Sequence, residues 1–305
     1  DRLFIGDYYA TPLLMIASAY ANDSAVLLYT DDGNSSISII QGKPRDNRPM
    51  GRMRQWIWYR DEYKPQQRYR KRVLNVLAER GVQCTNAFFT IYNDLPSKGF
   101  TLYPNKLCHL SDRVTPEHSD RPIVVIVGAA MAAYATQNRI PEAELDTIVR
   151  SQLSTVADLH KNTEIVYIPH GRDTNQEVRQ FCDTLHFVYQ KIDEPIEYYL
   201  LRSGMKPEYV YGFNSTALLN IKRLFPPAEV FNWFIEKKYD NSYYNFFSAV
   251  RRYYEQNNIK TILIKYPKPS ILKVAKKWMK DQYFVIKYIL KKIHRKLHLL
   301  KFSAN

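Results

Sequence analysis

The feature that most constrains the fold is a set of short, uninterrupted apolar runs, each ending in glycine or polar residues. The clearest is Ile123-Val124-Val125-Ile126-Val127, five β-branched residues followed by Gly128. Similar runs occupy residues 25–29 and 164–168. Runs of this length and composition predict strands buried on both faces, as in parallel sheets covered by helices.

Helical segments alternate with these strands. We expect helices over residues 13–21, over residues 66–80 with Gly81 as the C-terminal cap, from Pro141 onward, and over residues 195–201. Further short strands are expected at residues 2–6, 187–189 and 209–211. The alternation favours an α/β fold with two Rossmann-like domains that face each other across a cleft.

The chain has 305 residues, a length that suits two domains. A polar stretch with several prolines at residues 104–121 is the best candidate for a linker. We therefore expect a partial N-terminal acceptor-side domain with a basic loop and the linker (1–120), a nucleotide-binding domain (121–285) and a basic amphipathic helix (286–305).

Several classes of protein are excluded by missing motifs. No run of 18 apolar residues is present, so no transmembrane helix is expected. The three cysteines are far apart and form no CxxC pair, which argues against a disulfide scaffold, and no His cluster supports a metal site. Neither GxxxxGK[ST] nor a strand-linked GxGxxG occurs, so a P-loop ATPase and a dinucleotide enzyme are not expected.

The net charge of +14 is concentrated in two segments. Residues 43–72 carry about +8 and residues 260–301 about +12, which leaves about −6 for the remainder. An acidic body with two basic segments suits a protein that meets an anionic surface at particular places. The alternative is that both segments are simply solvent-exposed.

The candidate functional residues are polar side chains next to predicted strands and helices of this α/β pattern. They are Asp31, Asp32, His170, Arg172, Glu197, Ser215 and Thr216. Ligands of open α/β sheets gather at the carboxyl ends of the strands, and a Ser-Thr pair that starts a helix provides hydroxyl and backbone N–H donors for a phosphate. A carboxylate from one domain and a histidine from the other suit group transfer from a nucleotide-activated donor.

The order of these motifs resembles that of the bacterial sialyltransferases, and most of all glycosyltransferase family 52, the lipooligosaccharide sialyltransferase group. The resemblance rests on Asp31-Asp32-Gly33, Pro169-His170-Gly171-Arg172, Ile196-Glu197-Tyr198-Tyr199 and Asn214-Ser215-Thr216-Ala217. It covers residues 2–225. Gly171 stands where the family has proline, and no carboxylate follows the strand at residues 123–127. The family has a longer segment before the acidic motif, so the resemblance predicts an N-terminally truncated first domain.

The resemblance implies a GT-B-like fold and inverting, metal-independent transfer of sialic acid, or a related nonulosonic acid, from a CMP-activated donor. Asp31 or Asp32 would be the base, with Asp31 favoured. His170 would protonate or hydrogen-bond the departing phosphate, which Ser215 and Thr216 would hold. Glu197 would bind the CMP ribose, and Arg172 would lie beside the phosphate or the donor carboxylate.

The expected partners are a nucleotide-sugar donor, a glycan or glycolipid acceptor of bacterial lipooligosaccharide or capsule, and an anionic membrane surface, with no nucleic acid and no cofactor. The last segment has a helical aliphatic face opposite a basic face, typical of a helix that lies in a membrane interface. It predicts a cytoplasmic protein on the inner face of the bacterial inner membrane. The alternative is that this helix packs on the second domain. A homodimer is left open.

Two other functions remain as alternatives. One is a different sugar transferase of capsule or lipopolysaccharide assembly with the same fold. The other is a non-catalytic carbohydrate- or nucleic-acid-binding protein, suggested by aromatic residues within the first basic segment: Trp56, Trp58, Tyr59, Tyr63 and Tyr69.

Overall fold

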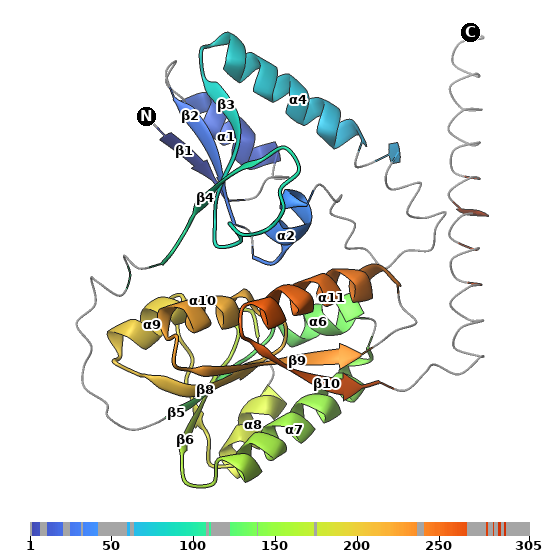
Figure 1. Ribbon diagram of the computed structural model, residues 1–305. Coiled ribbons are helices and arrows are strands. Elements are labelled where there is room, and N and C mark those ends of the chain that lie inside the picture. The colour runs from blue at the N-terminus through green and yellow to red at the C-terminus, as the bar shows by residue number, and fades with distance from the viewer. Residues whose placement is uncertain are drawn as a thin grey trace.

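The computed structural model is mixed α/β, with two parallel sheets of four and six strands. It describes residues 2–6, 11–20, 25–31, 33–41, 60–61, 64–107, 110, 123–138, 140–173, 176–236 and 241–266, together with positions 279, 283, 286, 287 and 290. We call the part up to residue 107 the first lobe and residues 123–266 the second lobe. The two lobes lie one above the other (Figure 1).

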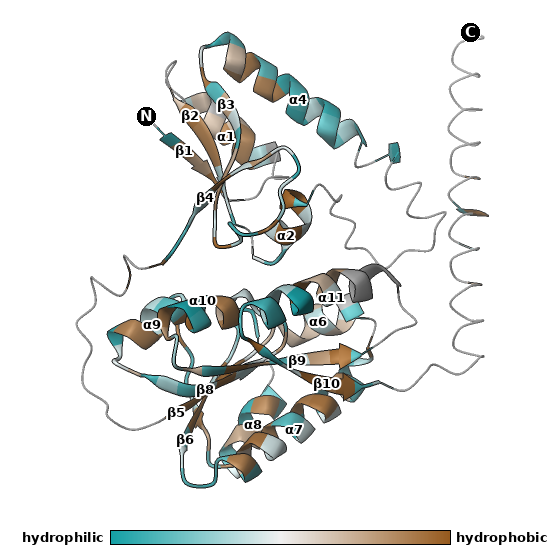
Figure 2. Ribbon diagram, viewed as in Figure 1, coloured by the Kyte–Doolittle hydropathy of each residue, from teal (hydrophilic) through white to brown (hydrophobic). Residues whose placement is uncertain are grey.

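The first lobe has a parallel sheet in chain order. Its strands are β1 (Arg2–Ile5), β2 (Val26–Thr30), β3 (Gln83–Thr90) and β4 (Thr101–Pro104). Its helices are α1 (Thr11–Tyr20), α2 (Ser35–Ile40) and α4 (Lys64–Glu79). Helices α1 and α4 pack against each other, and α2 lies on the side that faces the second lobe (Figure 1). Figure 2 shows that α4 is largely hydrophilic, which matches its part in the first basic segment.

The second lobe contains a six-stranded parallel sheet. Its strands are β5 (Ile123–Val127), β6 (Glu164–Ile168), β7 (Val188–Tyr189), β8 (Pro207–Gly212), β9 (Glu229–Glu236) and β10 (Lys260–Lys265). Their spatial order, β7-β6-β5-β8-β9-β10, is that of the doubly wound Rossmann fold, and it places the switch point between β5 and β8. All five residues of β5 are buried, as expected for a central parallel strand.

Helices cover both faces of the second sheet. They are α6 (Met131–Asn138), α7 (Glu142–Leu159), α8 (Gln176–Thr184), α9 (Ile196–Arg202), α10 (Thr216–Leu224) and α11 (Asn241–Gln256). Helices α7 and α8 lie on the face away from the first lobe, whereas α9, α10 and α11 lie on the face toward it (Figure 1).

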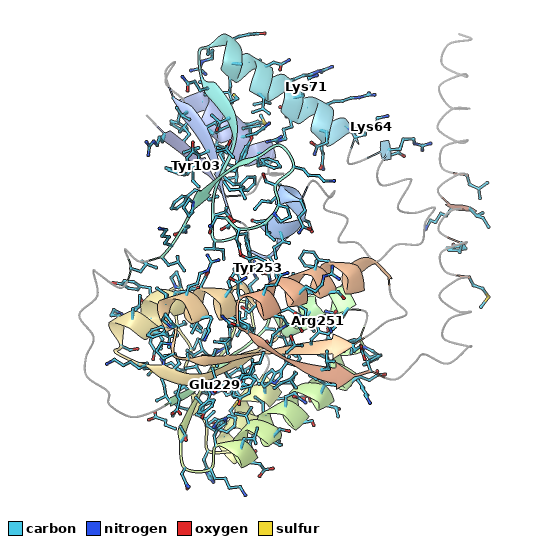
Figure 3. All side chains as sticks on the ribbon, in the orientation of Figure 1. Lys64, Lys71, Tyr103, Glu229, Arg251 and Tyr253 are labelled. Carbon is cyan, nitrogen blue, oxygen red and sulfur yellow. The ribbon has the colours of Figure 1, made fainter. Side chains whose placement is uncertain are left out.

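One cluster of buried apolar side chains contains residues from both lobes. Ile37 and Ile40 of α2 belong to the same buried cluster as Val125, Leu218 and Tyr254 of the second lobe. Tyr253, on the side of α11 that faces the first lobe (Figure 3), donates a hydrogen bond to the carboxylate of Asp94. Apolar burial and hydrogen bonds therefore both hold the lobes together.

The expected strands at residues 2–6, 25–29, 123–127, 164–168, 187–189 and 209–211 are present within a residue or two, as are the expected helices. Several elements of the structure were not expected from the sequence: β3, β4, β9, β10, α2, α6, α8 and α11. Residue 104 was assigned to the linker but belongs to β4, where its position pairs with Thr90. Most of the linker and most of the C-terminal segment lie outside the described residues.

Among the residues that the structure describes, no helix combines the length and the apolar composition needed to cross a membrane.

We predict that Ile40→Ala lowers the free energy of unfolding by about 2–5 kcal/mol, because a large side chain is removed from a closed core. Ile40 is 0% exposed in the cluster shared by both lobes. Ile16→Ala is the matched control, since Ile16 is 57% exposed, and it should change stability by less than about 0.5 kcal/mol. Denaturant unfolding measures both, and equal effects would contradict the shared core.

Candidate functional site

A cleft of about 540 Å³ opens at the carboxyl ends of β5, β6 and β8, at the switch point of the second sheet. Its volume falls in the range of small-molecule sites. It is lined by Val127, Gly128, Ile168, Pro169, His170, Gly171, Lys191, Ile192, Asp193, Glu194, Ile196, Glu197, Ser215 and Ala217. Three residues proposed from the sequence, His170, Glu197 and Ser215, thus meet in one cleft although they lie far apart in the chain.

The floor of the cleft is made where the ends of β5 and β6 approach each other closely. A Cβ added to Gly128 would lie 2.9 Å from the Cα of Pro169 and 3.0 Å from the carbonyl oxygen of Ile168. Both contacts are with backbone, which cannot move aside cheaply. A side chain at Gly128 would therefore clash with the backbone of the neighbouring strand end.

His170 lies in the turn that follows β6, and hydrogen bonds define its orientation. The backbone N–H of Arg172 donates to Nδ1 of His170 at 3.1 Å, and the N–H of Asp173 donates to the His170 carbonyl oxygen at 2.7 Å. With Nδ1 accepting, the neutral ring carries its proton on Nε2. Burial and then the charge of Arg172 lower the pKa of His170, against a smaller opposite effect of Asp173. At neutral pH the ring is therefore an N–H donor.

Glu197 and Ser215 lie at the starts of two neighbouring helices. Glu197 lies in the first turn of α9, and its Oε1 accepts a hydrogen bond from the amide of Asn220 at 2.6 Å. Ser215 is the N-cap residue of α10 but makes no capping hydrogen bond with its side chain. Its hydroxyl and the first N–H groups of α10 are thus available to an anion in the cleft.

Thr216 lies beside Ser215 but does not line the cleft. Its hydroxyl donates to the phenol of Tyr92, a residue of the first lobe. Its Oγ1 also lies 3.2 Å from the point where Gly33 would carry a Cβ. From the sequence, we expected Thr216 to hold the phosphate. In the structure, its hydroxyl lies at the contact between the lobes.

Arg172 does not line the cleft, although its charge lowers the pKa of His170. Its side chain is exposed and lines a neighbouring hollow of about 770 Å³, together with the start of α6 and with Asp146, Asp173 and Glu177. The backbone of Arg172, through its bond to His170, is what contributes to the cleft.

Asp31 follows β2 at the carboxyl edge of the first sheet. Its Oδ1 accepts a hydrogen bond from the hydroxyl of Thr90 at 2.6 Å, and its Oδ2 accepts one from the N–H of Ile91 at 2.7 Å. Burial raises the pKa of the Asp31 carboxyl, while these bonds and the charge of Arg223 oppose the increase. Asp31 does not line the cleft. Asp32 lies outside the described residues.

Two further residues at the cleft were not expected from the sequence. One lines the cleft, and the other binds a side chain that does. Lys191 lines the cleft and comes just after β7, so the rule that ligands gather beyond the carboxyl ends of strands would have found it. Asn220 holds Glu197 from the second turn of α10, and no sequence pattern marks it. Within the described residues, no cluster of three or more His, Cys, Asp or Glu side chains could hold a metal ion.

No protein-family model matches this chain, and no curated protein matches it significantly.

We predict that Gly128→Ala destabilises the protein and impairs ligand binding in the cleft, because the new methyl group would meet backbone atoms of β6. Gly171→Ala is the matched control at the same cleft, since an added Cβ there would have no atom within 4 Å. Thermal unfolding should show a lowered midpoint for the first variant and an almost unchanged one for the second. Equal stability would contradict the close approach of β5 and β6.

Proposed function

We propose that this protein is a glycosyltransferase that moves sialic acid, or a related nonulosonic acid, from a CMP-activated donor to a terminal sugar of a bacterial surface glycan. The observation that carries the proposal is the meeting of His170, Glu197 and Ser215 in one cleft at the switch point of a Rossmann-like sheet. The proposal also adopts the GT-B-like arrangement, the inverting outcome and the metal independence that the sequence resemblance implies.

The cleft offers groups suited to each part of CMP. The Ser215 hydroxyl, the N-terminus of α10 and the cation of Lys191 suit the phosphate. The carboxylate of Glu197 suits the two ribose hydroxyls, because a carboxylate accepts two hydrogen bonds and Asn220 occupies only part of its capacity.

In the proposed reaction, the acceptor hydroxyl attacks the anomeric carbon of the donor. A new C–O bond forms, the bond from that carbon to the phosphate oxygen breaks, and CMP leaves. The hydroxyl proton passes to Asp31 or Asp32. Burial raises the pKa of the Asp31 carboxyl toward neutral pH. A general base works best when its pKa lies near the pH of the reaction.

His170 stabilises the leaving phosphate by donating Nε2–H. The sequence left open whether this histidine protonates or hydrogen-bonds the phosphate. Its lowered pKa and its occupied Nδ1 favour hydrogen bonding, because a neutral ring with one N–H can stabilise developing charge without carrying an extra proton.

We predict that CMP stabilises the protein against heat more than UDP or GDP does, and that Ser215→Ala and Glu197→Gln each weaken CMP binding about tenfold or more. A lost hydrogen bond to a charged group costs about 1.5–3 kcal/mol. Isothermal titration measures the dissociation constants. Glu229→Gln is the control, since Glu229 pairs with Lys260 outside the cleft.

The outcome separates the candidate functions. Stronger stabilisation by UDP or GDP would indicate a different sugar transferase. No stabilisation by any nucleotide would refute the proposed donor. Unchanged CMP affinity in both variants would place the nucleotide elsewhere.

We further propose that the C-terminal segment binds the anionic inner face of the bacterial inner membrane. Two described positions in it, Ile286 and Leu290, are more than half exposed, and so are Met279 and Tyr283, which precede it. Their spacing places them on one helical face, and the segment is rich in lysine and arginine. Each basic side chain near an anionic leaflet contributes about 1 kcal/mol.

Cosedimentation with vesicles tests this attachment. The full chain should bind vesicles that contain anionic lipid at low salt and should ignore neutral vesicles. A chain ending at residue 284 should bind neither. Undiminished binding after truncation would show that another surface is responsible, and unfolding after truncation would favour packing of the segment on the second lobe.

A further inference from the structure

The turn between β8 and α10 has an unusual backbone that is held from three directions. Asn214 has φ = 43°, in the left-handed region, and is 7% exposed. Its N–H donates to Oδ1 of Asn232, and its own Oδ1 accepts from the Asn232 amide at 3.0 Å. Its Nδ2 donates to the phenol of Tyr134, and its carbonyl oxygen accepts from Nδ2 of Asn34 at 2.6 Å. Each of its four polar groups is thus paired.

The residue that follows this turn is the one that faces the cleft. The carbonyl oxygen of Ser215 accepts a hydrogen bond from the phenol of Tyr254 at 2.7 Å, while its hydroxyl makes no capping bond. A strained conformation persists only where its surroundings determine it strongly, and such residues concentrate at functional sites. The bonds to Asn214 and Ser215 therefore fix the backbone that carries the Ser215 hydroxyl and the first N–H groups of α10.

One of these bonds comes from the other lobe. Asn34 is the N-cap residue of α2, a place where asparagine normally caps its own helix, yet it makes no capping bond. Its Nδ2 reaches Asn214, and its Oδ1 accepts a hydrogen bond from the phenol of Tyr92 at 2.8 Å and lies 3.0 Å from that of Tyr254. Asn34 directly follows the acidic turn at residues 31–33.

We propose that Asn34 and Tyr254 are positioning residues that couple the acidic turn of the first lobe to the anion-binding end of α10. The side-chain amide of Asn34, from the first lobe, and the phenol of Tyr254, from the second, hold two successive carbonyl groups, so the backbone that carries the Ser215 hydroxyl is fully held only when the lobes are in contact. The consequence for CMP rests on the proposed function; the consequence for the backbone of the turn does not.

Two measurements on the full chain test this coupling. In Asn34→Ala and in Tyr254→Phe, hydrogen–deuterium exchange of the segment 212–219 should become about fivefold faster, because each variant removes one hydrogen bond to a carbonyl group of the turn. The dissociation constant for CMP should rise by a similar factor. Tyr254→Phe keeps the aromatic ring in the core and serves if Asn34→Ala does not fold.

Tyr253→Phe is the matched control. It removes a phenol that also crosses between the lobes, to Asp94, but touches neither carbonyl group of the turn. It should lower the unfolding midpoint without faster exchange in segment 212–219 and without a change in CMP affinity. An equal change of exchange in this control, or unchanged exchange in both test variants, overturns the coupling.

The two proposals fail in different ways. Faster exchange in the test variants combined with no CMP binding by the wild-type chain would leave the positioning role standing and refute the proposed donor. CMP binding that is unaffected by the test variants, despite faster exchange, would refute the link between the turn and the nucleotide.

Discussion

The arrangement of the candidate site depends on one requirement, that every buried polar group of the β8–α10 turn be paired. A buried carbonyl or N–H group without a partner costs about as much as a lost hydrogen bond, and the left-handed conformation of Asn214 adds its own cost. No single element of the second lobe meets this requirement. The partners come from β9, from α6 and from Asn34 of the first lobe. The pairing of this turn is therefore a property of both lobes together.

Backbone sterics impose the second constraint, at the floor of the cleft. Gly128 follows β5 where it meets the backbone of β6, and a Cβ on Gly212 would lie 3.0 Å from the carbonyl oxygen of Val127. One glycine ends β8 and another follows β5, and both lie where an added Cβ would meet neighbouring backbone atoms. The side chains around this floor, His170, Glu197 and Ser215, come from turns and helix starts. The sheet therefore determines the shape of the cleft, and the turns and helix starts carry its functional side chains.

Nearly complete burial made the central strands β5 and β6 predictable, but burial does not explain every outcome: β1 and β7 were predicted although they are partly exposed, and β9 was missed although most of it is buried. Residues 123–127 and 164–168 are almost continuously apolar because helices cover both faces, so their pattern is clear. Strand β3 begins with polar, partly exposed residues, and its buried positions lie near its end. Helix α2 has only six residues and is stabilised by contact with the second lobe, which no local pattern reveals.

The candidate site was also predicted only in part. The rule about strand ends brought His170 and Ser215 into one cleft, because topology alone determines where those ends lie. It did not predict the directions of neighbouring side chains. Thr216 turns toward Tyr92, and Arg172 lines another hollow, because tertiary contacts decide these orientations. Likewise, the turn after β6 has Gly171 after the histidine, and the N–H groups of Arg172 and Asp173, which bond to His170, define its conformation.

The contact between the lobes also bears on the proposed base. Burial is the largest influence on the Asp31 carboxyl and raises its pKa, whereas Arg223 of the second lobe lowers it. Any separation of the lobes would admit water and remove the attraction of Arg223, two changes that shift the pKa in opposite directions. The contact that aligns Ser215 thus also brings the charge of Arg223 to bear on Asp31, so both halves of the proposed reaction depend on the same lobe arrangement.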